Sequence, residues 1–491
     1  MSNAMQPDIA GADPASPEPQ RWAMFAVLLV GSFLPPLDFF IVNVALPSIQ
    51  GELGASSSAG QLVISAYAAL YAVTLTTGGR LGDLFGRSRV FVCGLAGFSA
   101  ASLLCGVAWS PWALVAGRAL QGIGAAVMAP QALASVQAIF PESEKPRALG
   151  LYGAVFGLAS VIGQALGGVL IALDLFGLGW RAVFLVNLPV ALLVILFGIP
   201  YLKRTGETGA GKLDPGGMIL SMLTLALLIV PLIEGREAGW PWWSWLSLAA
   251  APLLARLFWR YERRLAQAGG APLLDPAALR APGLGRALLI ALSFYSVASF
   301  FLLLSIYLQT ALHASALDAG LVFFPFGAGY LVGPLCTPWF RRRLGSWVNP
   351  VGMGLECAGF LGLAWLVAAT PGGMAPASTL LAVLLFVIGF GQGLALPTLM
   401  NLITGRAAPA HAGMIAGVAS STLQVSAALG VAVVGGIFYT MLGGRDDPAA
   451  IAHAFSVAAL CIAACLGAGV VLGMTLARRG ATTAHGRAAR S

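Results

Sequence analysis

Long apolar segments separated by short links run through almost the whole chain. Hydrophobic residues make up 58% of it and charged residues only 9%, whereas a soluble domain is about 25% charged. About 20 apolar residues suffice for a helix to cross a bilayer. We count fourteen such segments, at 22–46, 60–80, 89–109, 111–139, 147–172, 181–202, 214–233, 241–259, 284–309, 316–338, 347–369, 376–402, 412–440 and 450–477. The chain is therefore predicted to be an all-α integral membrane protein, because helices satisfy their own backbone hydrogen bonds in lipid.

Lysine and arginine are concentrated in every second link. The basic links and tail lie at 80–89, 145–147, 203–212, 256–286, 341–343 and 478–490, with Arg406 after the twelfth segment. Cytosolic loops of membrane proteins carry an excess of basic residues. This alternation predicts that both termini are cytosolic, and it accounts for the net charge of +8 without a nucleic-acid partner.

The two longest interior links, 203–213 and 260–283, divide the chain. They predict an N-terminal six-helix bundle at 22–202, a linker with two inserted transmembrane helices at 203–283, a C-terminal six-helix bundle at 284–477 and a cytosolic tail at 478–491. Met1–Ala4 before Met5 look like a cloning remnant. The rest of 1–21, rich in proline, alanine and acids, is predicted to be disordered and cytosolic.

Three charged side chains fall inside predicted spans. Asp38 is costly at bilayer depth, so it indicates a functional site by default. The Pro35–Pro36 pair just before it is predicted to break the helix, and the alternative is a structural Asp38 that caps this kink. Arg118 stays charged in any plausible environment, so it must face water, a cavity or an acid, unless it forms a static ion pair. Glu356 is either a second proton site or a partner for a polar group of another helix.

The segment 79–89, GRLGDLFGRSR, is the strongest local pattern. Its glycines allow a tight turn between two helices, and Asp83 can cap a helix or pair with an arginine. The segment resembles the signature loop of the major facilitator superfamily at the same place in the chain. The resemblance implies a conformational switch made of Gly79, Asp83, Gly86, Arg87 and Arg89. A degenerate copy at 341–345 has Arg342 where the counterpart of Asp83 would stand.

Further motifs resemble the fourteen-helix drug:proton antiporters of the EmrB/QacA type. The segment 37–47, LDFFIVNVALP, is similar to their first-helix motif, with Phe40 in place of the usual threonine. The segment 117–124, GRALQGIG, places Arg118 at the position of an arginine that this family uses in proton coupling. Residues 180–189, WRAVFLVNLP, resemble the opening of the family's sixth helix.

The fifth predicted span is rich in small residues that allow close helix packing. Its segment GQALGG resembles the antiporter signature G-P-x-x-G-G, with glutamine in place of proline. The packing motif comprises Gly153, Gly157, Gly163, Gln164, Gly167 and Gly168.

Polar residues elsewhere in the spans are candidates for lining a cavity, although each alone is more often a contact between helices. They are Asn43, Gln121, Gln392, Asn401 and Gln424. The segment 206–213, GETGAGKL, nearly matches a phosphate-binding loop, but it lacks the hydroxyl residue and the preceding strand of that motif. The histidines are scattered, so we expect neither a metal nor a cofactor.

These resemblances imply a major facilitator fold of two six-helix bundles plus two inserted central helices. They imply a monomeric, proton-coupled transporter of the plasma (inner) membrane, not an enzyme, which exports hydrophobic or cationic compounds by drug:proton antiport. Its partners would be such compounds, protons and membrane lipid, with a periplasmic adaptor protein if the host has two membranes. The main alternative is an exporter or symporter of another cargo, such as a lipid, a siderophore or a secondary metabolite; a membrane-embedded enzyme and a receptor are more distant alternatives.

Overall fold

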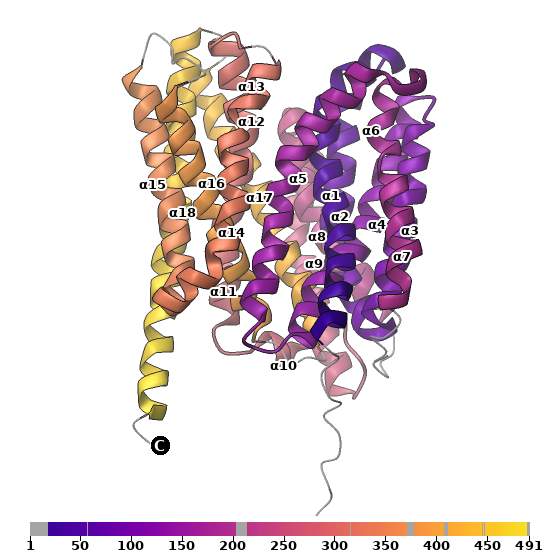
Figure 1. The fold of residues 1–491 in the computed structure, drawn as a ribbon, viewed down its shortest axis with the longest axis vertical. Helices are drawn as coiled ribbons and strands as arrows, with labels where there is room; N and C mark the ends of the chain where they lie inside the picture. The colour runs from indigo at the N-terminus through magenta and orange to yellow at the C-terminus, as the bar shows by residue number, and fades with distance from the viewer. Residues whose placement is uncertain are drawn as a thin grey trace, which may run out of the picture.

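The computed structural model describes residues 18–55, 57–202, 214–314, 316–370, 378–406, 411–443, 445 and 447–488, and over these residues it contains helices and no strand. Two groups of long helices stand side by side, with the N-terminal group on the right of Figure 1 and the C-terminal group on the left. Residues 1–17 and the segment 206–213 lie outside the described residues.

The N-terminal group is built around a central helix, α4. Its elements are α1(Glu18–Leu53), α2(Ser57–Phe85), α3(Arg87–Gly106), α4(Pro111–Ile139), α5(Lys145–Leu173), η1(Leu175–Gly177), η2(Gly179–Arg181), α6(Ala182–Leu185) and α7(Asn187–Leu202). α4 packs along both α2 and α3. Gly122 faces the backbone of Tyr67 and Gly124 faces that of Phe98, so that any side chain here would separate the helices.

The C-terminal group packs in the same manner. Its elements are α11(Leu284–Phe294), η3(Tyr295–Val297), α12(Ala298–Ile306), η4(Tyr307–Ala311), α13(Ala316–Val322), α14(Phe324–Leu344), η5(Gly345–Trp347), α15(Val348–Ala369), α16(Thr379–Thr404), α17(Ala412–Leu442) and α18(Pro448–Ala488). α16 lies along α14 and α15, and α15 also packs against α18. α18 continues about ten residues past the predicted end of the last span.

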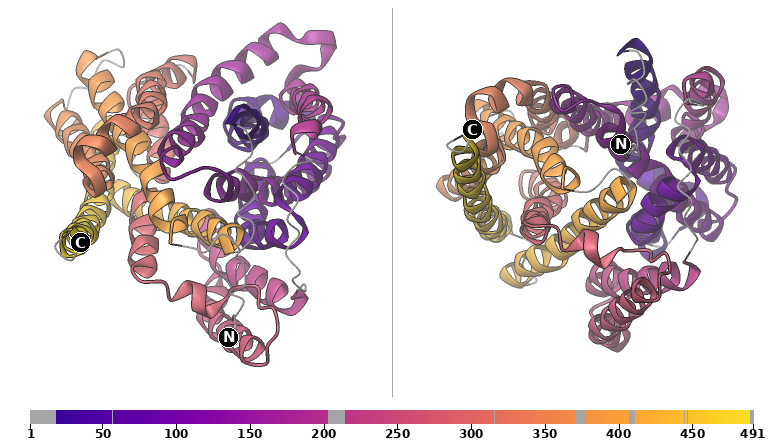
Figure 2. Two further views of the ribbon diagram at one scale, coloured as in Figure 1. Left: turned by 60° about the horizontal axis from the view of Figure 1, so that its bottom comes forward. Right: turned by 90° about the horizontal axis from the view of Figure 1, so that it is seen from below.

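The chain between the groups forms α8(Pro215–Glu237), α9(Trp242–Gln267) and the short α10(Pro276–Leu279). α8 packs along α9 and against α2 and α17, one helix from each group. Figure 2 shows this pair on the flank of the molecule, where the two groups meet. The pair thus covers one side of the interface and does not lie between the groups.

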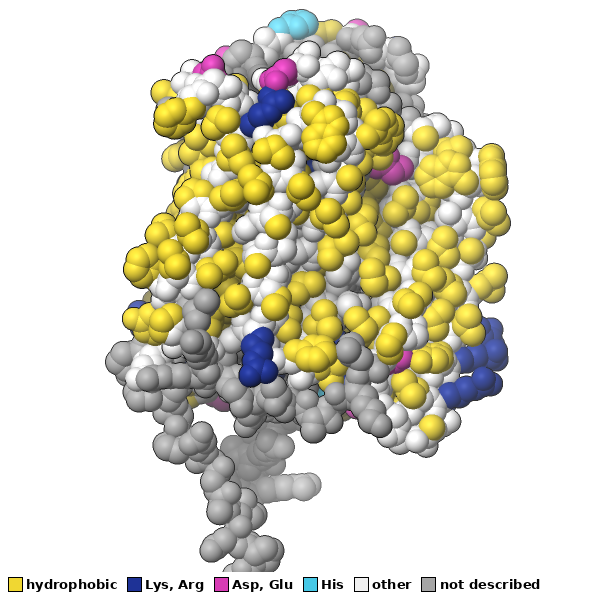
Figure 3. Space-filling model, turned by 90° about the vertical axis from the view of Figure 1, so that its right-hand side faces the viewer, with side chains coloured by type: hydrophobic (Ala, Val, Ile, Leu, Met, Phe, Trp, Pro, Cys, Tyr) yellow, Lys and Arg dark blue, Asp and Glu magenta, His cyan; other side chains and the backbone are white. Residues whose placement is uncertain are grey.

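Eleven stretches of the described residues are long and apolar enough to cross a membrane. The longest, Asp318–Ala369, contains both α14 and α15. Apolar side chains cover the middle of the surface in Figure 3, and charged ones lie toward its two ends. The chain is therefore a multi-pass membrane protein.

One local expectation is wrong. The Pro35–Pro36 pair does not break the first helix, because α1 continues from Glu18 to Leu53. Prolines are tolerated in membrane helices where neighbouring groups satisfy the freed backbone. The hydroxyl of Tyr67 on α2 donates a hydrogen bond of 3.1 Å to the carbonyl of Pro35.

Candidate functional site

Asp38 and Arg118 meet inside the N-terminal group. Nη1 of Arg118 on α4 donates to Oδ2 of Asp38 on α1, and both side chains are fully buried. Asp38 lies about 24 Å along α1 from Trp22, and Arg118 lies about 10 Å from the start of α4. Because α1 and α4 run in opposite directions, the two residues reach the same depth, in the half remote from the termini.

Three polar side chains complete the surroundings of the pair. Gln121 donates a hydrogen bond of 2.8 Å to Oδ1 of Asp38. Asn187 at the start of α7 donates a hydrogen bond of 3.0 Å to the same oxygen. Ser102 on α3 accepts a hydrogen bond of 2.8 Å from Gln121. All three are buried. The carboxylate is therefore held by donors from two helices and balanced by one guanidinium, as a buried charge requires.

Arg118 is also bound on its other sides. Its Nε donates 2.9 Å to the carbonyl of Val63, and its Cζ lies 4.2 Å from the ring centroid of Tyr67. Nη2 has no hydrogen-bond partner among the described residues. A buried guanidinium with one free donor edge is a site where an acceptor or a water could enter without removing an existing bond.

The loop at 79–89 joins the two helix groups. Asp83 on α2 accepts hydrogen bonds from the backbone amides of Gly413 and Met414, at 3.0 and 2.8 Å, in the first turn of α17. Arg87 lies 3.4 Å from the Asp83 carboxylate. A carboxylate at a helix N-terminus is favoured by the helix dipole, so Asp83 ties the two groups together at the end that carries both termini.

Glycines set the geometry of this loop. Gly79 faces the backbone of Gly413, which lets α2 and α17 come into contact. Gly86 has a φ of 89°, which favours glycine, and α3 begins directly after it. Arg89 is exposed at the start of α3.

The packing motif of α5 acts at two interfaces. Gly153 contacts Pro334 and Pro397, and Gly157 contacts the backbone of Tyr330, all from the other helix group. Gly163 contacts Leu37 and Phe40 of α1.

Gly168 departs from the packing prediction. It is exposed, and no atom lies within 4 Å of where its Cβ would be, so it is not a packing position. Gly167 is buried, and the side chain of Gln164 lies outside the described residues.

Glu356 lies in the other helix group and does not join Asp38. It is fully buried on α15, and neither carboxylate oxygen has a hydrogen-bond partner among the described residues. The backbone of Gly391 on α16 packs directly against it. An unpaired buried carboxylate is strongly disfavoured, and among the described residues no cation balances Glu356.

The remaining polar candidates do not gather in one place. Gln121 belongs to the Asp38 network, whereas Gln392 is buried in α16 with its Oε1 unpartnered among the described residues. Asn401 and Gln424 are half-buried on α16 and α17, and the side chain of Asn43 is not described. No group of three or more His, Cys, Asp and Glu residues in the described part of the chain could hold a metal ion.

Four tyrosines that sequence reasoning missed converge where the helix groups face each other. Tyr71 on α2 and Tyr152 on α5 come from one group, and Tyr295 in η3 and Tyr330 on α14 come from the other. They lie close enough to interact electrostatically. The signal available in the sequence was the presence of tyrosine hydroxyls inside apolar spans, where a buried hydroxyl requires a hydrogen-bond partner.

Aromatic rings continue this contact between the groups. The rings of Phe40 on α1 and Phe301 on α12 lie 6.2 Å apart, and Phe301 packs against Phe323 and Phe326 at 5.7 and 5.1 Å.

Comparison with known proteins decides the family. Residues 28–431 match the Major Facilitator Superfamily. The chain belongs to that superfamily. The assignment to the superfamily that the sequence motifs implied is thus confirmed.

Several superfamily relatives align along most of the chain. A probable actinorhodin transporter of Streptomyces coelicolor is 36% identical over 89% of this chain and 76% of its own length. A puromycin resistance protein of Streptomyces alboniger is 37% identical over 88% of this chain and 85% of its own length. A cephamycin export protein of Amycolatopsis lactamdurans is 34% identical over 88% of this chain and 87% of its own length. The crystal structure of a human organic anion transporter superposes with a TM-score of 0.62 at 18% identity, over 92% of this chain and all of that one, which supports the fold alone.

Proposed function

We propose that this member of the superfamily exports hydrophobic or cationic compounds across the plasma membrane in exchange for protons. The observation that carries the proposal is the buried Asp38–Arg118 pair with its donors Gln121 and Asn187. An acidic residue inside the membrane is energetically costly and therefore indicates a functional site. The antibiotic exporters and resistance proteins among the relatives support a drug-like cargo.

In this proposal Asp38 is the proton carrier. When a proton binds Oδ2, the carboxyl loses its charge and Arg118 loses its ionic partner. The freed guanidinium can then bind a new acceptor through Nη2, which has no partner among the described residues. Since Asp38 is held by α1, α4 and α7 together, a change in its charge alters how these helices pack. Proton-bound and cargo-bound protein can therefore favour opposite-facing conformations.

The cargo would bind between the helix groups, against the aromatic side chains there. Tyr71, Tyr152, Tyr295 and Tyr330 offer ring faces and hydroxyls from both groups, and rings of this kind attract organic cations. Apolar and aromatic walls with few polar groups are typical of sites for drug-sized ligands. This location also lets cargo and protons communicate, because Tyr71 stacks on Tyr67, whose ring faces Arg118.

The loop at 79–89 would act as the latch of the conformation seen here. Asp83 and the first turn of α17 hold the groups together at the end that carries the termini. Opening that end requires both hydrogen bonds to break. Glu356 would be a second proton site in the C-terminal group, separate from the exchange at Asp38.

We also propose fourteen transmembrane helices with both termini in the cytosol, and transport by a monomer. The arginine distribution supports this topology, because the basic ends of α9, α14 and α18 would all lie on the cytosolic side. An adaptor protein in the periplasm would be an additional partner in a host with two membranes. Labelling of single cysteines placed near residue 485 tests the topology: modification from outside intact cells would contradict it.

Proton flux in proteoliposomes tests the proposed exchange. A fluorescent lipophilic cation loaded inside the vesicles should leave while the lumen becomes more acidic, because protons enter in exchange. Alkalinisation of the lumen would indicate symport instead, and export without any pH change would remove the proton from the mechanism. Asp38→Asn should abolish coupled proton movement in a protein that is less stable, because the ion pair is lost, but still folds and binds cargo.

Two further variants complete this test. Asp447→Asn is the matched control, because Asp447 caps the start of α18 outside the bundle and its loss should leave transport unchanged. If Asp38→Asn transports with normal proton coupling, the carrier role of Asp38 is wrong, and the same measurement on Glu356→Gln shows whether Glu356 has it.

A further inference from the structure

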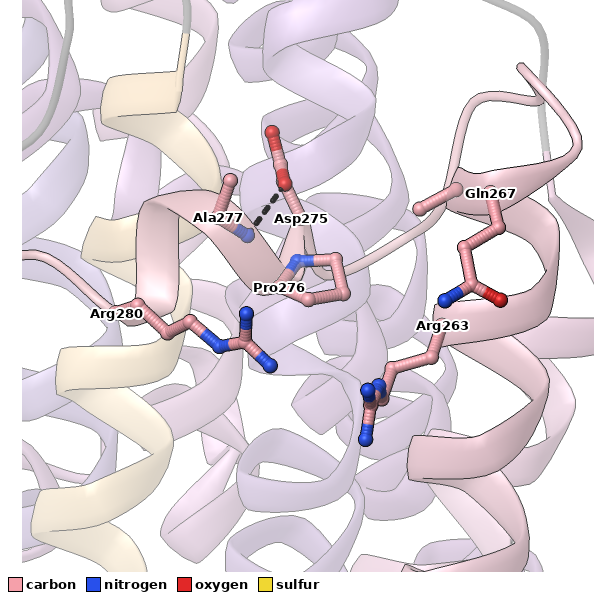
Figure 4. Close-up of a pocket in the computed structure, with 7 residues that line it drawn as sticks. Arg263, Gln267, Asp275, Pro276, Ala277 and Arg280 are labelled. Carbon is pink, nitrogen blue, oxygen red and sulfur yellow. Dashed lines mark hydrogen bonds between the residues drawn. The ribbon is translucent and has the colours of Figure 1, made fainter.

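A pocket of about 240 Å³ opens between the end of α9 and the short helix α10. It is lined by Arg263, Ala266 and Gln267 of α9 and by Asp275, Pro276, Ala277 and Arg280. Figure 4 shows Arg280 and Arg263 reaching toward the space below Pro276 from its two sides, while the carboxylate of Asp275 points away from it. This pocket is distant in the fold from the Asp38 network and plays no part in the proposed exchange.

The pocket has an excess of positive charge. Among the described residues, neither guanidinium, of Arg263 or of Arg280, takes part in an ion pair. Asp275 supplies one negative charge against the two arginines, and both its oxygens already have other partners. Oδ1 accepts 2.8 Å from the amide of Ala277, and Oδ2 lies 3.3 Å from Nε2 of His411. The two guanidiniums thus present only donors to the pocket, and these need an anion or water.

The position of the pocket along α9 matches the headgroup layer of a bilayer. Leu253 and Leu257 are 72% and 54% exposed on this helix, as expected of a surface in contact with acyl chains. Arg263 lies six residues further on, about 9 Å along the axis. The polar layer begins at the edge of the hydrocarbon and is about 5 to 8 Å thick on each side. The long side chain of an arginine at this depth reaches phosphate groups.

We propose that Arg263 and Arg280 bind the phosphate of an anionic phospholipid, such as phosphatidylglycerol, in the leaflet next to the termini. The planar guanidinium matches phosphate oxygens in pairs, and basic pockets at this depth are suited to lipid headgroups. The exposed leucines on the preceding turns of α9 favour a lipid over a soluble anion. This bound lipid would anchor the inserted helix pair, which packs on α2 and α17 at the junction of the two groups.

Lipid titration of the purified, delipidated transporter tests this site. Native mass spectrometry would follow the occupancy of one phosphatidylglycerol, with phosphatidylcholine and inorganic phosphate as separate arms. Loss of one arginine–phosphate contact costs about a factor of 5, so Arg263→Gln with Arg280→Gln should weaken phosphatidylglycerol binding roughly 25-fold. The control Arg260→Gln with Arg264→Gln removes the same charge from the same helix outside the pocket, and it should bind like wild type.

Each possible result either supports or contradicts the proposed lipid site. Selective loss in the pocket variant supports the site, whereas equal loss in the control would assign binding to diffuse charge and overturn it. Inorganic phosphate that binds as tightly as phosphatidylglycerol would overturn the lipid assignment in favour of a soluble anion, and equal binding of phosphatidylcholine would overturn the anionic one. If the double variant does not fold, Arg263→Gln and Arg280→Gln singly should each lose about 5-fold, and unchanged binding in both would refute the site.

Discussion

Asp38 shows how a carboxylate is accommodated in an apolar bundle. Its charge is balanced by Arg118, which donates to Oδ2, and its Oδ1 accepts hydrogen bonds from Gln121 and Asn187. Breaking a buried pair by removing one partner costs about 3–5 kcal/mol, because the remaining charge is left uncompensated. The same arrangement that stabilises the resting bundle thus makes it sensitive to the arrival of a proton.

A double-mutant cycle measures this coupling. Asp38→Asn and Arg118→Gln should each lower the free energy of unfolding by about 3–5 kcal/mol, whereas the double variant should recover much of the loss and still fail to couple protons. Thermal unfolding in detergent across the four proteins is the measurement. Strictly additive losses would mean that the two side chains do not interact.

At the scale of elements, two contacts hold helices from different parts of the chain together. One is the junction of α2 with α17 through Asp83. The other joins the start of α8 to the end of α9, where Asp214 and Glu262 approach each other beside Gly217.

Loss of the Asp83 contact should slow transport but spare cargo binding. Asp83→Asn keeps the shape of the side chain but loses one acceptor for the amides of Gly413 and Met414. We therefore expect the maximal transport rate to fall about 5- to 10-fold, which corresponds to about 1–1.5 kcal/mol for one hydrogen bond. Equilibrium binding and transport in the same vesicles separate the two effects. A drop in affinity with normal turnover of bound cargo would argue against a latch.

The environment of Glu262 predicts that the stability of the inserted helix pair, α8 and α9, depends on pH. Burial and, after it, the nearby Asp214 raise the pKa of Glu262 from 4.5 to about 7, although the amide of Leu274 opposes the shift. Oδ1 of Asp214 is bound by the amide of Gly217 and by Tyr261. In contrast, Oδ2 of Asp214 and Oε1 of Glu262 lack a donor among the described residues. A proton on Glu262 would bridge them.

The sign of the effect follows from the raised pKa. The folded state binds this proton more tightly than the unfolded chain, so its contribution to stability is complete below pH 4.5 and is lost as the pH rises to about 7. The melting temperature should therefore fall between pH 5 and 8 in wild type and fall less in Glu262→Gln, which keeps a donor at every pH. Glu142→Gln, at an exposed glutamate, is the control; identical slopes in wild type and Glu262→Gln would contradict the prediction.

At the scale of the whole molecule, the two helix groups touch along α2–α17 and α5–α14. Any exchange of inward- and outward-facing states must separate one of these contacts. The hydroxyls of Thr76 on α2 and Ser421 on α17 lie 2.9 Å apart, and both residues also line a pocket of about 230 Å³ shared with α8 and α9.

Cysteines at these two positions should lock the transporter. Thr76→Cys with Ser421→Cys is expected to form a disulfide under mild oxidation, which abolishes transport until a reductant restores it. Each single variant is the control for oxidation of the native cysteines. Unchanged transport in the fully cross-linked protein would show that α2 and α17 do not separate during the cycle.

Local patterns were sufficient to predict the all-α class and the superfamily. Apolar runs of about 20 residues have one stable backbone solution in lipid, and the GRLGDLFGRSR pattern marks a tight turn through its glycines. The depth of Asp38 and Arg118 also followed from counting residues along their helices, so their meeting was predictable.

The partners of these residues were decided by the tertiary structure. Asn187 reaches Asp38 from a distant helix and Ser102 supports Asn187. Asp83 binds α17 as well as Arg87 of its own loop, and Gly168 faces open space. The tyrosines of the interface and the Arg263–Arg280 pocket have no spacing signal. The physical reason is that periodicity states which residues an apolar helix carries, whereas the rotation and packing of each helix against its neighbours depend on the shapes of all of them at once.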